Sequence, residues 1–165
     1  MKIPRIMFVD DEPNILTGIR RALNEHSSEW DMAFFSDGHD ALKFMDEFRA
    51  NVVVTDIAMP TMDGKSLIYK LHERFPDSIP IVLSGHWDMT ISLKELGQNV
   101  RFLGKPLRRD LLVWAIKDAV ADSRFSPSNL LRHAPPIKTL AFKPPVESGA
   151  VYSDGWTDVL RKIGE

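Results

Sequence analysis

The hydrophobic pattern up to residue 123 alternates between short apolar runs and longer stretches with a helical period. The short runs predict β-strands at residues 5–9, 30–35, 51–56, 81–83 and 100–103. The longer stretches predict helices near residues 13–26, 41–48, 64–75, 87–96 and 112–120. Strands that alternate with helices in this way are typical of βα units around a parallel sheet. We therefore predict an α/β fold with a doubly wound, five-stranded parallel sheet.

The third apolar run is the centre of this pattern. Val52, Val53 and Val54 follow one another without a polar position, which predicts a strand covered on both faces. Met59-Pro60 then breaks the run, so Asp56 stands at the carboxyl end of the strand, where sites form in open α/β sheets. Taken alone, Asp56 is more simply interpreted as a solvated loop residue or a helix cap, because aspartate is common at such boundaries.

The composition changes after residue 123, where several prolines interrupt any helix or inner strand. These prolines are Pro127, Pro135, Pro136, Pro144 and Pro145. A last apolar set has helical spacing, and it comprises Trp156, Val159, Leu160 and Ile163. A helix this short needs a surface to pack on. We expect a domain at residues 1–124, a proline-rich linker at 125–150, and a short amphipathic helix or tail at 151–165.

The charge and composition narrow the functional classes. The formal net charge of −2 gives no basic excess, which argues against nucleic-acid binding by this chain alone. The chain has no cysteine, which excludes disulfides and thiolate metal sites. We find no apolar run of membrane-spanning length and no secretory signal, so we expect no membrane association and a cytoplasmic location.

Polar side chains stand at the carboxyl ends of four predicted strands. They are Asp10, Asp11, Asp56, Ser84 and Lys105. Because strand ends of a parallel sheet share an edge, we expect these five side chains to converge. Three carboxylates repel one another unless a cation offsets their charge, and such oxygen ligands suit Mg²⁺ or Mn²⁺. A metal, an ammonium group and a hydroxyl would bind a phosphoryl group, and an attacking carboxylate would form an acyl phosphate.

Five short motifs occur in order along the chain, each at a predicted strand end. They are Val9-Asp10-Asp11-Glu12, Thr55-Asp56-Ile57-Ala58-Met59-Pro60, Met62-Asp63-Gly64, Leu83-Ser84-Gly85 and Gly104-Lys105-Pro106. Each motif alone is weak evidence for any protein family, but all five in this order, each at a predicted strand end, are a specific signal. Over residues 4–123, the chain resembles the receiver domains of bacterial two-component response regulators. The resemblance implies a flavodoxin-like (βα)5 receiver fold followed by a C-terminal tail.

The resemblance also implies roles for the residues at the strand ends. Asp56 would accept a phosphoryl group from a histidine kinase or a phosphotransfer protein. Asp10 and Asp11 would hold Mg²⁺ together with Asp56 and the main-chain carbonyl of Ala58. Lys105 would contact the phosphoryl oxygens.

Two further positions match the switch residues of the family. Ser84 would move to form a hydrogen bond with the phosphoryl group. Phe102 lies at the aromatic switch position, but it also suits an ordinary core site because it lacks the hydroxyl of tyrosine. The bond between Lys105 and Pro106 is expected to be cis, which sequence alone would not show.

A second apolar stripe on the last helix of the domain is a candidate interface. Leu111 and Trp114 lie on it, well away from the core-facing side of the helix. In the family, the face formed by the helix at 87–96, the strand at 100–103 and the last helix commonly forms dimers. We expect a homodimer or another protein partner there; the alternative is that loops or the core cover both side chains.

Three interpretations of the function remain. The leading one is a phospho-acceptor domain that signals by changing its protein contacts. Such a domain is not an enzyme, and it catalyses only its own phosphotransfer and dephosphorylation. The second is a Mg²⁺-dependent phosphatase with an aspartate nucleophile, although such enzymes place another aspartate where this chain has Ala58. The third is the sensor half of a regulator whose output domain is missing from the chain.

Overall fold

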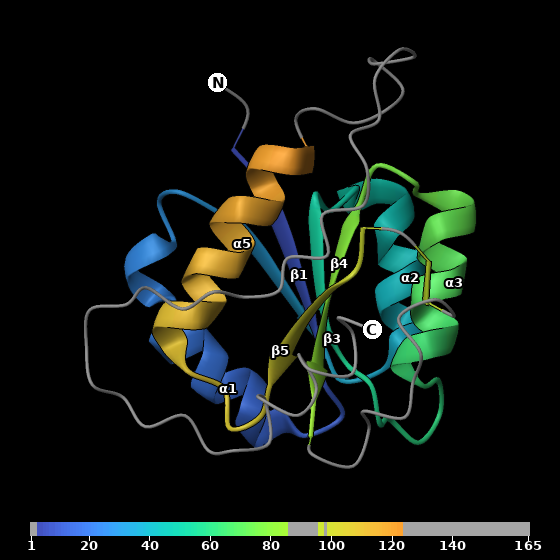
Figure 1. The fold of residues 1–165 in the computed structure, drawn as a ribbon, viewed down its shortest axis with the longest axis horizontal. Coiled ribbons are helices and arrows are strands. Elements are labelled where there is room, and N and C mark those ends of the chain that lie inside the picture. Colours follow the sequence, from blue (N-terminus) through green and yellow to red (C-terminus); the bar gives the residue numbers. More distant parts are fainter. Residues whose placement is uncertain (1–2, 86–95, 98, 124–165) are drawn as a thin grey trace, which may run out of the picture. The chain divides into compact units, whose positions relative to one another are not determined.

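The computed structural model describes residues 3–85, 96–97 and 99–123, which form a five-stranded parallel sheet with helices on both faces (Figure 1). The elements are β1 (Arg5–Val9), α1 (Pro13–Ala22), η1 (Asn24–His26), β2 (Asp31–Phe35), α2 (Gly38–Phe48), β3 (Val52–Asp56), α3 (Gly64–Arg74), β4 (Ile79–Ser84), β5 (Arg101–Gly104) and α5 (Arg109–Ser123). The predicted fold class is confirmed. The predicted linker and tail lie outside the described residues, as does all but the end of the predicted helix at 87–96.

The strands follow the order β2-β1-β3-β4-β5, and every neighbouring pair is parallel. The chain runs from β1 outward to β2 and then returns past β1 to β3, so the order reverses between β1 and β3. A crevice opens outside the carboxyl ends of the strands at such a reversal. Asp10 follows β1 and Asp56 ends β3, so both carboxylates lie at this point.

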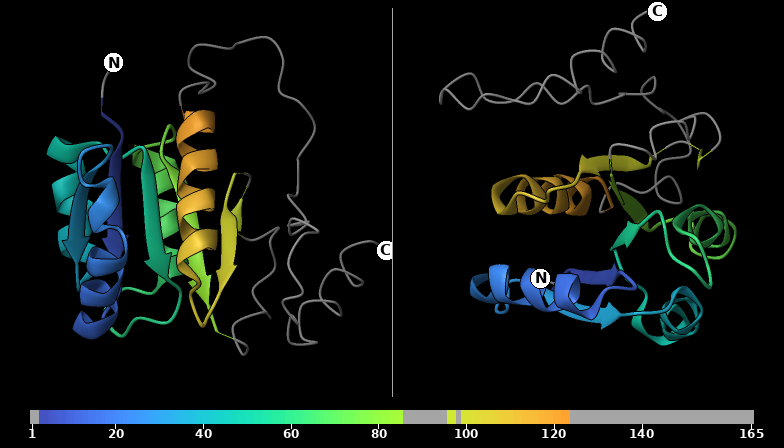
Figure 2. Two further views of the ribbon diagram at one scale, coloured as in Figure 1. Left: turned by 90° about the vertical axis from the view of Figure 1, so that its left-hand side faces the viewer. Right: turned by 90° about the horizontal axis from the view of Figure 1, so that it is seen from below.

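Alternate residues of β1 pack into two different core clusters. Ile6 and Phe8 of β1 face α1 and α5, whereas Met7 and Val9 face α2 and α3. Figure 2 shows the two pairs of helices on opposite sides of the sheet. Burial on both faces explains why the inner strands β1, β3 and β4 are mostly apolar rather than alternating with polar residues.

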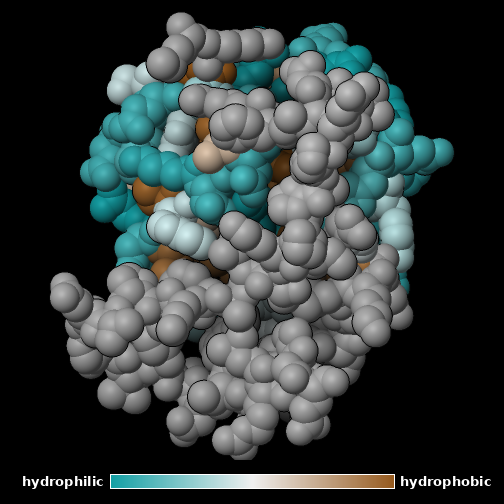
Figure 3. All heavy atoms as spheres, turned by 45° about the horizontal axis from the view of Figure 1, so that its top comes forward, coloured by the Kyte–Doolittle hydropathy of each residue, from teal (hydrophilic) through white to brown (hydrophobic). Residues whose placement is uncertain are grey.

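The outer surface differs in character from these clusters. On the face shown in Figure 3, most of the described surface is hydrophilic, and hydrophobic residues show only in small patches between polar ones. In the part of the chain that the structure describes, no helix is both long and apolar enough to cross a bilayer.

Helix α1 is shorter than the predicted helix at 13–26. It ends at Ala22 and is followed by the 3₁₀ turn η1. The carbonyl oxygen of Ala22 accepts a hydrogen bond of 2.6 Å from Nε of Arg109, at the start of α5. A side chain that is remote in sequence therefore satisfies a carbonyl group at the helix end, which periodicity alone could not indicate.

Strand β4 begins earlier than predicted and contains Pro80. The amide of Ile79 donates to the carbonyl of Asn51 at 2.9 Å, so at Pro80 the backbone nitrogen faces away from β3. On that side, β5 begins only opposite Ile81, where Arg101 pairs with it. Pro80 thus occupies an edge-like position where its missing N–H breaks no ladder hydrogen bond.

Candidate functional site

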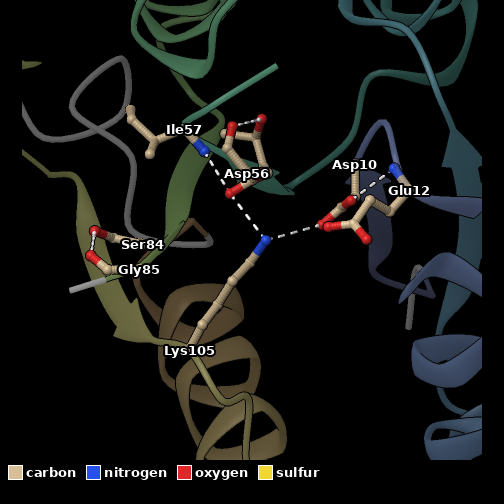
Figure 4. Close-up of polar contacts among 8 residues, drawn as sticks. Asp10, Glu12, Asp56, Ile57, Ser84, Gly85 and Lys105 are labelled. Carbon is tan, nitrogen blue, oxygen red and sulfur yellow. Dashed lines mark hydrogen bonds and ion pairs between the residues drawn. The ribbon is translucent and has the colours of Figure 1, made fainter. Parts of the chain in front are cut away.

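The ends of three strands bring an ammonium group and two buried carboxylates together (Figure 4). Nζ of Lys105, just after β5, lies 3.1 Å from Oδ1 of Asp56 and 3.5 Å from Oδ2 of Asp10. In Figure 4, the Lys105 side chain extends between the two carboxylates. The predicted convergence of these residues is therefore present in the fold.

A third carboxylate completes an acidic cluster. One carboxylate oxygen from each of Asp10, Asp11 and Asp56 lies within 4.8 Å of the other two. Asp10 and Asp56 are buried, whereas Asp11 is half-buried. Three carboxylates beside one ammonium group leave two formal negative charges uncompensated. Hard oxygen donors with this excess charge fit a Mg²⁺ ion that keeps some of its water ligands.

Backbone amides hold the two buried carboxylates in place. The N–H of Glu12 donates to Oδ1 of Asp10, and the N–H of Ile57 donates to Oδ1 of Asp56, both at 2.9 Å. Each carboxylate therefore has a fixed donor from its own turn in addition to Lys105. At Asp56, the hydrogen bond from Ile57 favours the ionised carboxylate.

The protonation of the site reflects competition between burial and charge. Burial raises the pKa of Asp56, and the charge of Asp10 adds to the rise, although Lys105 and the Ile57 N–H oppose it. Burial alone would lower the pKa of Lys105, but its hydrogen bond to Asp56 and the two carboxylate charges raise it. An ion pair by itself would lower the pKa of its acid, so at Asp56 the loss of water is the stronger effect. A further cation would favour ionised Asp56.

The two predicted switch residues have other contacts in this structure. The hydroxyl of Ser84 donates to the carbonyl of Gly85 at 3.1 Å, and Figure 4 shows the two side by side. Phe102 is half-buried against a small cluster that includes Ile68 and Val82. The peptide bond that follows Lys105 is cis, as predicted.

Gly64 allows the backbone after β3 to fold tightly against Asp56. A Cβ atom at Gly64 would lie 2.2 Å from the carbonyl oxygen of Asp56 and 2.8 Å from Cα of Ile57. The N–H of Gly64 donates to the carbonyl of Ile57 at 2.9 Å and closes this turn. In the sequence this glycine stands out only as part of a motif, because the close approach of two backbone segments leaves no further signal there.

The candidate interface residues differ in exposure. Leu111 is half-buried and packs against the core cluster below α5. Trp114 is 44% exposed. Neither residue belongs to the carboxylate cluster, so their expected role is in binding a partner rather than in phosphotransfer.

Comparison with known proteins places this geometry in a family. A family model described as the response regulator receiver domain matches residues 6–117. The C4-dicarboxylate transport transcriptional regulatory protein DctD of Pseudomonas aeruginosa is 28% identical over 117 residues, which are 70% of this chain and 25% of DctD. The sensor histidine kinase TmoS of Ectopseudomonas mendocina is 34% identical over 106 residues, 62% of this chain and 11% of TmoS.

A solved structure agrees with these sequence matches. The crystal structure of a response regulator receiver domain protein from Clostridium thermocellum has a TM-score of 0.68 and 25% identity, and it covers 74% of this chain and 98% of its own. The chain spans only about a quarter of DctD, so what the longer relatives do as whole proteins does not transfer directly. The family match covers more than half of the chain: this protein belongs to the response regulator receiver domains of two-component signalling systems.

Proposed function

We propose that Asp56 accepts a phosphoryl group from a histidine kinase or phosphotransfer protein in a Mg²⁺-dependent reaction, and that the chain signals by changing its protein contacts. One observation carries this proposal. The buried Asp56 carboxylate lies 3.1 Å from the Lys105 ammonium group, in a cluster with the carboxylates of Asp10 and Asp11. Membership of the receiver family supports the same role.

The proposed reaction is a direct transfer of the phosphoryl group. An oxygen of Asp56 attacks phosphorus, the O–P bond forms, and the P–N bond to the donor imidazole breaks. The electron pair of that bond stays on the imidazole nitrogen, which takes up a proton. When bound, Mg²⁺ would supply positive charge to the phosphoryl oxygens. Lys105 would exchange part of its contact with Asp56 for one of these oxygens.

The two switch positions suggest how the modified site is read. We propose that the Ser84 hydroxyl leaves the carbonyl of Gly85 and donates to a phosphoryl oxygen. Ser84 pairs with Gly104 in the β4–β5 ladder, and Val82 pairs with Phe102 two residues earlier. A shift at Ser84 is therefore close to Phe102, whose side chain is only half-buried.

The metal requirement predicts the behaviour of Asp11→Ala. The wild-type chain should gain one phosphoryl group from acetyl phosphate in Mg²⁺, and none in EDTA. Asp11→Ala should lower the labelling rate at a fixed Mg²⁺ concentration by at least about tenfold, since a charged ligand is lost. Intact-mass measurements follow the labelling. Asp40→Ala is a matched control, because Asp40 is exposed on α2 and should label normally. Equal labelling in EDTA would show that no metal is needed.

The exposed side chain of Trp114 predicts a dimer contact on α5. We propose that Leu111 and Trp114 belong to a homodimer interface on the side of the domain formed by β5 and α5. With beryllofluoride as a phosphoryl mimic, light scattering should show a dimer that Trp114→Ala weakens by about tenfold or more, as at an aromatic interface anchor. Tyr69→Ala, which removes an exposed aromatic on α3, is the control. A wild-type chain that stays monomeric with and without the mimic would exclude the dimer.

A further inference from the structure

The loop between β3 and α3 carries the main-chain carbonyl proposed as a metal ligand. Ala58, Pro60 and Thr61 are exposed in this loop, whereas Met59 and Met62 are buried in the core beneath α2 and α3. The loop therefore consists of exposed backbone between two apolar anchors. The position of the Ala58 carbonyl depends on how firmly the exposed part is held.

A hydrogen bond from Thr61 ties this exposed part to a distant corner of the fold. Its Oγ1 donates to Oδ2 of Asp37 at 2.5 Å, across 24 residues of sequence. The other oxygen of Asp37 accepts from the backbone N–H groups of His39 at 2.7 Å and Asp40 at 3.3 Å, and so caps α2. One carboxylate thus fixes both the start of α2 and the loop after β3.

The charge state of Asp37 fits this double role. The hydrogen bond from Thr61 and the backbone hydrogen bond from His39 lower the pKa of Asp37. The carboxylate is therefore ionised, and a hydroxyl that donates to an ionised acceptor forms a stronger hydrogen bond than one between neutral groups.

An apolar contact lies directly beside the polar one. A Cβ atom at Gly38 would lie 3.2 Å from both Cβ and Sδ of Met62, so Met62 packs closely against the backbone at the start of α2. Thr61 with Asp37 and Met62 with Gly38 are consecutive pairs. Together they join the loop to the α2 corner with one polar and one apolar contact.

We propose that Thr61 is a positioning residue for the metal site. Through Asp37 it restricts the loop, so that the Ala58 carbonyl is already in place when Mg²⁺ binds to the carboxylates. Without this link, binding would have to order the loop, and that loss of freedom would weaken the affinity. The inference rests on the proposed Mg²⁺-dependent function, and it assigns to the metal site a residue that does not bind the metal itself.

Thr61→Val tests the hydroxyl with almost no change in shape. In the full chain, Mg²⁺ titration followed by amide NMR shifts should show about fivefold weaker binding, the size expected for one hydrogen bond. Hydrogen exchange of residues 57–63 without the metal should become faster. Thr61→Ser keeps the hydroxyl and should restore both values. Thr17→Val is the matched control, since Thr17 is an exposed threonine that donates to Pro13 within α1.

A double-mutant cycle separates a role through Asp37 from a general loss of stability. Asp37→Gly keeps an acceptable helix cap and removes the acceptor. It should weaken Mg²⁺ binding as Thr61→Val does, and adding Thr61→Val should weaken it no further. Wild-type affinity in Thr61→Val, failure of Thr61→Ser to restore it, or additive losses in the double variant would each overturn the inference. A wild-type chain that binds Mg²⁺ as expected but gains no phosphoryl group would contradict the proposed function alone.

Discussion

Replacing Asp56 with asparagine should abolish phosphorylation of the chain. Asparagine has nearly the same shape and still accepts the Ile57 N–H, but its amide oxygen is uncharged and no nucleophile. Loss of a nucleophile typically lowers a rate by at least about 10³-fold. Intact-mass measurement after incubation with acetyl phosphate and Mg²⁺ should show the full label on the wild type and none on Asp56→Asn.

The same substitution at Asp63 provides a matched control. Asp63 caps α3 through a 2.6 Å hydrogen bond from the Ser66 N–H, and asparagine is an equally good cap. Asp63→Asn should therefore label like the wild type. A phosphoryl group on the Asp56→Asn chain would show that the acceptor is a different residue.

We also expect Asp56→Asn to change the stability of the metal-free domain. Burial raises the pKa of Asp56 in the folded chain, so its contribution to stability is lost as the pH rises through that pKa. Above that pKa, the ionised carboxylate is less favourable in the fold than in the unfolded chain. In EDTA, the variant should melt no lower than the wild type. A markedly lower melting temperature would indicate that the pairing of Asp56 with Lys105 outweighs its burial.

Replacing Gly64 with alanine should strongly destabilise the domain. The new Cβ would meet two backbone atoms, of Asp56 and Ile57, at distances that real structures do not show. Neither can move without distorting the end of β3, so the free energy of unfolding should fall by at least about 2 kcal/mol, towards the upper range for overpacking. Urea denaturation measures this loss, and the displaced Asp56 should also label more slowly.

Gly18 is the natural control for Gly64. It lies in α1, and an added Cβ would meet nothing within 4 Å. Gly18→Ala should stabilise the chain by about 0.5 to 1 kcal/mol, because alanine is a far better helix former than glycine. If Gly64→Ala unfolded at the same urea concentration as the wild type, the close approach to Asp56 would not constrain the backbone.

The parts of the fold that the sequence predicts are those with local causes. The run of three valines predicts a strand buried on both faces, and Val52, Val53 and Val54 are all buried. The convergence of Asp10 and Lys105 follows from one rule, that parallel strands end at one edge. Both inferences need only the identity and order of residues near each strand.

Contacts between distant segments have no local cause that the sequence would show. The end of α1 depends on Arg109, and Pro80 is tolerated because β5 starts one position later. The link between Thr61 and Asp37 joins an exposed threonine to a half-buried aspartate, and such polar residues are common in any loop and carry no periodic signal. The direction of the Ser84 hydroxyl is a rotamer choice that depends on its surroundings, so the sequence does not specify it.

The acidic residues of the charge cluster come long before its lysine in the sequence, which matters while the chain is being synthesised. Asp10 and Lys105 are 95 residues apart, and the carboxylates of Asp11 and Asp56 also precede the ammonium group. A growing chain, made from its N-terminus, therefore contains every acidic group of the cluster before their counter-charge exists. Until β5 joins the edge of the sheet, the ends of β1 and β3 carry only like charges. Addition of β5 thus completes the sheet, and Lys105, which follows it, offsets part of this repulsion.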